Sequence, residues 1–191
     1  MILKRILLIF LVKSLYSQNT AFVNFQNYVK DPEGFRISIN YIQEYYGEKF
    51  ESSGLFFCKD DSYTFDNIYQ RITYTDSSIT TINKNAKQVI YDSPSLDDVT
   101  IFDILAGKMK NVQIKDSFID KQSNCIPFFI DKWDIQGKLW TNIINGAPKR
   151  IILNQGEEIK VEIIISLLDD SMDTDLLYYD IKNCEIIDLR E

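Results

Sequence analysis

Alternating apolar and polar residues along most of the chain predict a protein built mainly of β-strands. In FRISINYI (35–42), Phe35, Ile37, Ile39 and Tyr41 fall on one face of a strand, and polar residues fall on the other. Similar segments follow, separated by short turns, at 54–59, 62–67, 70–76, 78–84, 87–93, 111–118, 125–134, 138–144, 148–155, 158–168, 176–181 and 185–189. This spacing favours an antiparallel sheet whose neighbouring strands are also neighbours in sequence.

The segment TAFVNFQNYVK (20–30) breaks this alternation with helical spacing. Phe22, Phe25 and Val29 recur at intervals of three and four residues, as on one face of a helix. The following DPEG contains Pro32 and Gly34, which end a helix. We therefore expect a short amphipathic helix before the first strand.

A second helix is predicted at 95–107. Ser95 can cap it, with Asp98 three positions later, and Gly107 supplies the end. Its apolar stripe is broader than a surface helix needs and comprises Leu96, Val99, Ile101, Phe102, Ile104 and Leu105. The helix is therefore expected to be an insertion in the sheet that packs on an apolar surface.

A sheet of about eleven strands has to curl or close, because the twist of its strands accumulates. A curled sheet has a concave apolar face, and the two predicted helices are the segments available to cover it. The pattern therefore predicts a hollow protein with an α-helical lid. A barrel whose interior is filled by side chains fits the same pattern.

The first eighteen residues have the order of a secretory signal. Lys4 and Arg5 precede the apolar run at 6–12, and small or polar residues follow as far as Gln18. The run is too short to span a bilayer. We predict a cleaved signal peptide at 1–18, export of the chain, and one domain at 19–191; a buried N-terminal helix is the alternative.

The composition argues against several classes of function. A formal net charge of -7 disfavours a nucleic-acid partner. Cys58, Cys125 and Cys184 are odd in number and form no C-x-x-C pair, so buried thiols are expected rather than a metal or redox site. We expect no cofactor and no bound metal.

Enzymatic activity is not expected either. The chain has no histidine, which removes the Ser-His-Asp and Cys-His arrangements. Adjacent acids such as Asp60 and Asp61 point to opposite faces of a strand, although a carboxylate pair from distant strands stays open. Alternating acids from Asp169 to Asp180 imitate a calcium loop, but Thr174 replaces its glycine, so an acidic hairpin turn is the preferred interpretation.

A family resemblance is carried by SGLFFCKDDSYTFDN (53–67), ITYTDSSITTINKNAKQVIYD (72–92) and TIFDILAGK (100–108). These segments resemble the central part of LolA-like periplasmic outer-membrane lipoprotein carrier proteins, and the order of elements matches over about 20–191. The family's Asp-Gly turn falls on Asp76 and Ser77, so its glycine is missing. Its basic latch residue falls on Lys59, and lysine lacks the planar donor fork of the family's arginine.

The resemblance implies an open, unclosed antiparallel β-barrel of the mainly β (α+β) class, with an α-helical lid over a hydrophobic cavity. It also implies a periplasmic carrier that holds the acyl chains of lipoproteins and shuttles them from inner to outer membrane. The implied partners are acylated lipoproteins, an inner-membrane releasing transporter and an outer-membrane acceptor, and the carrier is expected to be a monomer. A lipid-sensing signalling domain of the envelope and a filled-core structural β protein are the alternatives.

The lipid-binding residues follow from one assumption about the latch. If Lys59 points to the lid, alternation puts Leu55 and Phe57 on the cavity face and leaves Phe56 and Cys58 on the convex face. The other residues predicted to bind lipid are Tyr63 and Phe65 on the partner strand and Ile101, Phe102 and Leu105 on the lid.

Overall fold

A computed structural model describes residues 19–95, 98–167 and 179–190. Its helical elements are α2 (Thr20–Val29), α3 (Ile101–Leu105) and the short 3-10 helix η1 (Asp131–Trp133). Its strands are β1 (Phe35–Tyr45), β2 (Glu48–Lys59), β3 (Ser62–Asn67), β4 (Gln70–Tyr74), β5 (Ile79–Asn83), β6 (Gln88–Asp92), β7 (Gln113–Ile114), β8 (Phe118–Asp120), β9 (Ser123–Ile130), β10 (Ile135–Asn142), β11 (Pro148–Gln155), β12 (Ile159–Leu167) and β13 (Glu185–Asp188).

Several sequence predictions fall wholly or partly outside these residues. They include the signal peptide at 1–18, Leu96 in the second predicted helix, the end of the strand expected at 158–168, the start of the strand expected at 176–181, and most of the acidic segment that imitates a calcium loop. Among the described residues no helix has the length and apolarity needed to cross a membrane.

The strands form one unclosed sheet in the order β13-β6-β5-β4-β3-β2-β1-β12-β11-β10-β9-β7, with β8 also paired to β9. Every pairing is antiparallel except that of β13 with β6. The described part of the chain thus has thirteen strands rather than about eleven. The predicted strand 111–118 is divided into β7 and β8, and the described residues 179–181 of the segment expected at 176–181 are not in a strand.

Two tight hairpin turns join the first three strands. Tyr46 and Gly47 connect β1 to β2, and Asp60 and Asp61 connect β2 to β3; all four residues have positive φ. A pair of residues with positive φ gives the turn twist that matches flanking antiparallel strands, and aspartate tolerates this conformation. The doubled acid is therefore a turn, which brings β3 directly against β2.

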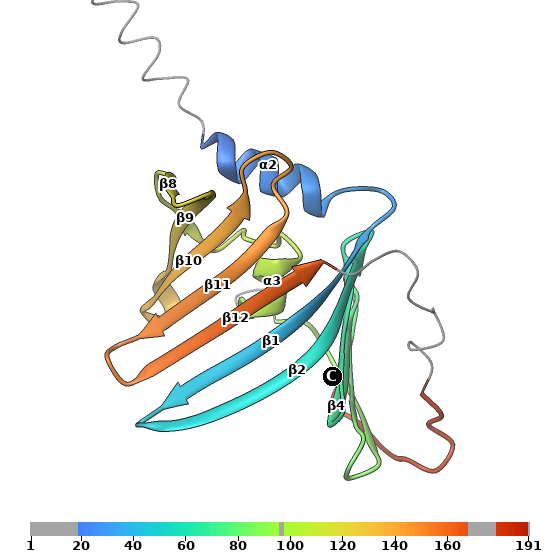
Figure 1. Ribbon diagram of the computed structural model, residues 1–191. Coiled ribbons are helices and arrows are strands. Elements are labelled where there is room, and N and C mark those ends of the chain that lie inside the picture. The colour runs from blue at the N-terminus through green and yellow to red at the C-terminus, as the bar shows by residue number, and fades with distance from the viewer. Residues whose placement is uncertain (1–18, 96–97, 168–178, 191) are drawn as a thin grey trace, which may run out of the picture.

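The concave face of the sheet carries the core, and both helices pack against it (Figure 1). On β1 the predicted face is confirmed: Phe35, Ile37 and Ile39 are buried. From α2, Phe25 and Val29 enter the same core. The sheet curls around the helices (Figure 1), and the two edge strands that the structure describes do not pair with each other. The predicted open architecture is therefore confirmed.

The second helix is shorter than predicted. It begins after Thr100 rather than Ser95, because Thr100 and Asp103 form the capping box: the Thr100 hydroxyl accepts from the Asp103 N–H, and the Asp103 carboxyl accepts from the Thr100 N–H. Gly107, with φ of 73°, follows the C-cap as expected.

Candidate ligand-binding groove

A groove of about 500 Å³ opens beside the lid helix α3, between it and strands β1 to β4. This volume lies within the range of about 300–1,000 Å³ that is typical of small-molecule sites. The apolar part of its lining consists of Tyr41, Phe50, Phe65, Tyr69, Ile101 and Phe102. None of its lining residues is charged. The groove therefore offers an aromatic and aliphatic surface without an ionic partner.

The ring of Phe102 forms the boundary between this groove and the packed interior. It stacks on Phe65 with ring centroids 4.6 Å apart and on Phe56 at 6.1 Å. The next residues of α3, Ile104 and Leu105, have no solvent exposure. The lid thus fills the centre of the concave face, and the open space lies along the outer side of Phe102.

The polar residues of the groove are largely hydrogen-bonded to one another. The Tyr41 hydroxyl donates to Gln43 Oε1 at 3.0 Å, and burial raises the pKa of Tyr41. Asn67 Nδ2 donates to Ser52 Oγ at 3.2 Å, while Asn67 Oδ1 accepts from the Gln70 N–H at 2.7 Å. Polar groups that already have hydrogen-bond partners do not need a hydrogen bond from a ligand. An apolar chain can therefore lie against them at low cost.

The mouth of the groove exposes large apolar side chains. Phe50 is 53% exposed and Tyr69 is 45% exposed. Ile68, which is 74% exposed, lines an adjoining pocket of about 260 Å³ that shares Tyr69 with the groove. Contiguous apolar exposure of this kind marks interaction sites more often than scattered single residues do.

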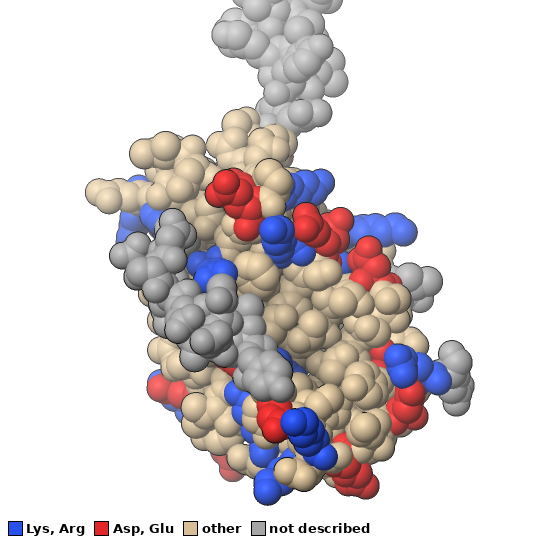
Figure 2. All heavy atoms as spheres, turned by 90° about the vertical axis from the view of Figure 1, so that its right-hand side faces the viewer, with Lys and Arg blue, Asp and Glu red and all other residues tan. Residues whose placement is uncertain are grey.

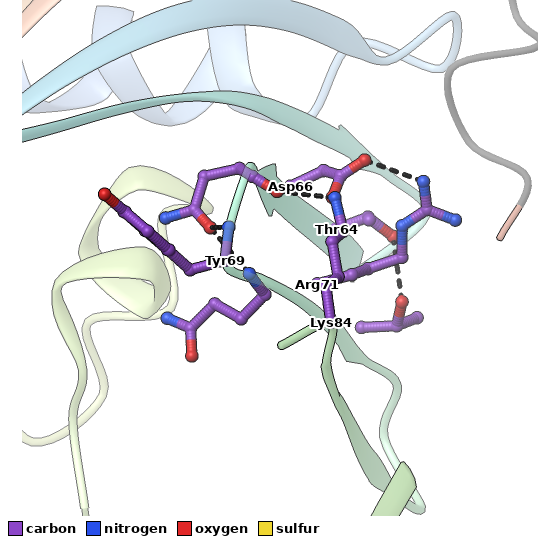
Figure 3. A network of polar contacts seen from close by, with 8 residues as sticks. Thr64, Asp66, Tyr69, Arg71 and Lys84 are labelled. Carbon is purple, nitrogen blue, oxygen red and sulfur yellow. Dashed lines mark hydrogen bonds and ion pairs between the residues drawn. The ribbon is translucent and has the colours of Figure 1, made fainter. Parts of the chain in front are cut away.

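A polar network fixes the turn that carries Tyr69 (Figure 3). Asp66 forms ion pairs with Arg71 at 2.7 Å and with Lys84, and all three side chains are mostly buried. The Lys84 ammonium also donates to the Asn67 carbonyl, and its backbone N–H donates to the Tyr69 carbonyl at 2.9 Å. In Figure 3 the Tyr69 ring points away from the ion pairs. The network holds this side chain at the mouth before any ligand arrives.

A buried hydrogen bond joins the lid to the sheet. The Tyr63 hydroxyl on β3 donates to Asp103 Oδ1 on α3 at 3.2 Å, and both residues are buried. The other Asp103 oxygen accepts from the N–H and hydroxyl of Thr100 at 2.8 and 2.7 Å. Burial raises the pKa of Tyr63, so this phenol keeps its proton at neutral pH and serves as a donor. We call this contact the lid clasp.

Two ion pairs join the segments flanking the lid helix to the rest of the molecule. Lys108 lies 3.3 Å from Asp76 and places its ammonium 4.2 Å from the centre of the Tyr74 ring. Lys132 lies 2.6 Å from Asp98, whose pKa it lowers. Both acids are well exposed, so neither ion pair adds much to the stability of the fold. The lid clasp is buried and Phe102 stacks on the buried Phe65, so these contacts contribute more to keeping the lid against the sheet.

Three of the predicted lipid-binding residues line the groove, namely Phe65, Ile101 and Phe102. Tyr63 instead lines a separate pocket of about 640 Å³ on the other side of the lid. The walls of that pocket carry both aspartates and lysines. Leu105 is fully buried in the core and borders neither space.

The predicted face of β2 is wrong. Phe56 and Cys58 are the buried residues of this strand, whereas Leu55 and Phe57 are only partly buried and Lys59 is exposed. Phe56 pairs with Phe65 in the ladder and stacks on Tyr63. By alternation Leu55, Phe57 and Lys59 therefore lie on the convex face, away from the lid.

The error came from placing Lys59 at the lid by resemblance. Gly54 shows the true face, because a Cβ at this position would lie 2.5 Å from the Phe65 ring. The glycine makes room for Phe65 on the concave side, and residues Ser52, Phe56 and Cys58 share that side with it. The polar contacts that join the lid segment to strands β3 and β4 are made by Tyr63 and Lys108 rather than by Lys59.

The sequence interpretation missed Tyr41, Phe50 and Tyr69 as groove residues. Tyr41 was already on the apolar face of the first predicted strand, so the signal for it was present. Phe50 was missed because the predicted strand began at Gly54, whereas β2 begins at Glu48. Tyr69 lies in the turn between β3 and β4, where strand alternation gives no direction for a side chain.

Comparisons with other proteins give matches in structure only. No family model matches the sequence, and no curated protein matches it. An uncharacterized conserved protein from Thermus thermophilus is similar in structure with a TM-score of 0.53, at 6% identity, over 86% of this chain and 96% of that one. An identity of this size shows a shared fold and nothing about ligands.

Solved structures with lower similarity include two proteins of named families. A LolA superfamily protein from Nitrosomonas europaea has a TM-score of 0.48 at 9% identity, over 85% of this chain and 98% of that one. A DUF1329 family protein from Desulfovibrio piger has a TM-score of 0.49 at 8% identity, over 84% and 96%. The open sheet with a helix on its concave side, which the sequence predicted, is the fold that the chain has.

Proposed function

We propose that the protein is a non-catalytic carrier that binds the acyl chains of lipoproteins in the groove beside α3. In this proposal it works in the periplasm as a monomer, receives lipoproteins from a releasing transporter of the inner membrane, and passes them to an acceptor at the outer membrane. The predicted signal peptide supports the location. The observation that carries the proposal is the uncharged aromatic groove at the edge of the lid.

The hydrophobic effect supplies the reason for such a carrier. Each methylene removed from water is worth about 0.8 kcal/mol, so an acyl chain of about sixteen carbons has a free-energy cost in water of about 13 kcal/mol. The exposed rings of Phe50 and Tyr69 line the same groove as Phe102. A carrier of moderate affinity can release its cargo to a tighter acceptor without an energy source.

The experiment is native mass spectrometry of the exported protein with a synthetic tripalmitoylated lipopeptide. The test variant is Phe50→Glu, which places a carboxylate at the groove mouth, where it would have to lose its hydration against an acyl chain. Phe118→Glu is the matched control, because Phe118 is 50% exposed and lies on β8, outside the groove.

We expect the wild type and Phe118→Glu to form lipopeptide adducts and Phe50→Glu to lose them, while urea unfolding stays similar in all three. The proposal is wrong if the wild type takes up no lipopeptide. It is also wrong if both charged variants lose the adduct equally, since binding would then not depend on the groove.

A further inference from the structure

The end of the molecule where α2 begins exposes several large apolar side chains. Ile144 is 90% exposed, Ile119 is 69% exposed and Phe118 is 50% exposed, and Ile143 and Val23 are each more than two-fifths exposed. They belong to the β10–β11 turn, to β8 and to α2, which meet at the top of Figure 1. We call this surface the apolar end.

Contacts show that these three segments form one surface. Asn142, at the end of β10, pairs with Ser123, at the start of β9 beside β8. Gly146 in the β10–β11 turn packs so closely on α2 that a Cβ there would lie 2.3 Å from the Asn24 carbonyl oxygen. The side chain of Asn19, the N-cap of α2, donates to the Lys115 carbonyl ahead of β8 at 2.8 Å.

The most exposed side chain is held outward by a rigid turn. Asn142 Oδ1 accepts from the Ile144 N–H at 2.8 Å, and Asn145 Oδ1 accepts from the Ala147 N–H at 3.1 Å. Asparagine and glycine are common in turns, because they form local hydrogen bonds or adopt positive φ. Isoleucine has neither property, so turn formation does not explain its presence at position 144. Its exposure on a fixed turn indicates a surface that meets a partner.

The charges around the apolar end suit a lipid headgroup region. Lys149 reaches the β8–β9 turn, where its ammonium lies 3.3 Å from Ser123 Oγ, and Lys121 lies within that turn. The acid beside them, Asp120, accepts from the Trp140 indole N–H at 2.9 Å. Lysines beside exposed apolar side chains can reach phosphates while those side chains enter the interface. In Figure 2 the spheres nearest the start of α2 are neither acidic nor basic.

Asn19, the first described residue and the N-cap of α2, lies at this same end, so the preceding sequence joins the described structure here. Its apolar run at 6–12 is flanked by Lys4, Arg5 and Lys13, and Asn19 lies seven positions after Val12. Seven extended residues span at most about 25 Å. While the run is attached and inserted in a membrane, the apolar end must therefore lie near that membrane.

We propose that the apolar end docks reversibly on the surface of a phospholipid bilayer. The strand register puts the groove at the opposite end of the sheet. The groove residues Gln43 and Phe50 lie near the β1–β2 turn, which is at the same end as the β11–β12 turn, whereas the β10–β11 turn is at the other end of β11. A docked molecule thus directs its groove away from the bilayer. The proposal goes beyond the acyl-binding function and does not depend on it.

The test is flotation of the exported protein with vesicles of phosphatidylethanolamine and a minority of phosphatidylglycerol, after its N-terminus has been determined by mass spectrometry. The variant Ile119→Ser/Ile144→Ser removes two exposed side chains from the apolar end. The matched control is Ile186→Ser, since Ile186 is 63% exposed and lies on β13, away from this end. Such exposed substitutions leave the fold intact.

We expect vesicle affinity to fall about tenfold or more in the double variant and to stay unchanged in the control. Failure of the wild-type protein to float, or an equal loss in both variants, would overturn the proposal. Concentration-dependent self-association that the double variant abolishes, without vesicle binding, would assign the surface to a second copy and overturn it too. Phe50→Glu should float like the wild type, which separates this test from the test of acyl binding.

Discussion

The lid clasp gives a sharp prediction for Tyr63→Phe. The change removes one hydroxyl and keeps the ring, which stacks on Phe56 at 5.5 Å and on Tyr74 at 4.9 Å between centroids. Asp103 then loses the partner of Oδ1 in a buried place but keeps both bonds from Thr100. The effect is therefore confined to a single hydrogen bond between lid and sheet.

The size of the effect follows from that bond. Leaving one buried acceptor unsatisfied costs about 1–2 kcal/mol, which raises the population of the open lid about fivefold to thirtyfold. Hydrogen exchange measured over residues 98–112 reports this opening directly. Urea unfolding should show a loss of stability no larger than the same 1–2 kcal/mol.

Tyr41→Phe is the control, because the Tyr41 hydroxyl bonds to Gln43 in the groove and does not touch the lid. It should leave exchange over residues 98–112 unchanged. The clasp has no role in closing the lid if Tyr63→Phe exchanges there no faster than Tyr41→Phe.

The clasp also depends on pH. Because burial raises the pKa of Tyr63, the unfolded chain begins to lose its phenol proton near pH 10 while the folded chain still holds it. Stability from this group is therefore complete below about pH 10 and is lost as the pH rises further. Tyr63→Phe should weaken the fall in stability above that pH, and an unchanged fall would contradict the assignment.

Three further changes test the sheet. Gly54→Ala should cost about 1–3 kcal/mol in urea unfolding, because the new methyl group meets the Phe65 ring; no cost would mean that Gly54 does not face the groove side. Asp66→Asn should lower the free energy of unfolding by about 3 kcal/mol, because it removes the anion that two mostly buried cations share. A change within error of zero would show that these ion pairs do not stabilise the fold. Iodoacetamide should modify Cys184 before Cys58, since burial raises the pKa of Cys58 to about 11; equal rates in the folded protein would contradict that burial.

Local patterns predicted the elements and one face of the core. Alternation placed Phe35, Ile37 and Ile39 on the buried face of β1, and helical spacing with DPEG bounded α2. Strand alternation and helical spacing involve residues of a single element, so both can be read from the sequence alone. Cys58 and Cys125 are buried, as expected for the cysteines, whereas Cys184 is only partly buried.

Other features depend on contacts that no single segment encodes. Leu55, Phe56 and Phe57 are all apolar, so alternation alone could not choose the inner face of β2; the close approach of Phe65 to Gly54 decides it. Ser95 and Thr100 are equally good caps by residue type, each with an acid three positions later. Thr100 becomes the N-cap where its partner Asp103 also bonds to Tyr63 on a distant strand.

The groove shows the same division. Ile101 and Phe102 were predicted from the apolar stripe of the lid, which is a local signal. Phe50 and Tyr69 belong to the groove only because the β1–β2 hairpin extends further than its composition suggests and because ion pairs fix the β3–β4 turn. Periodicity cannot predict a turn that is held by residues of β3, β4 and the β5–β6 turn.

The most direct test of acyl-chain carriage is photo-crosslinking in a double-membraned host grown with radiolabelled palmitate. A photoreactive residue replaces Tyr69 at the groove mouth or, as the control, Phe57 on the convex face. The account predicts crosslinked products that carry palmitate from position 69 and none from position 57. Products without palmitate at position 69, or equal labelling at both positions, would contradict it.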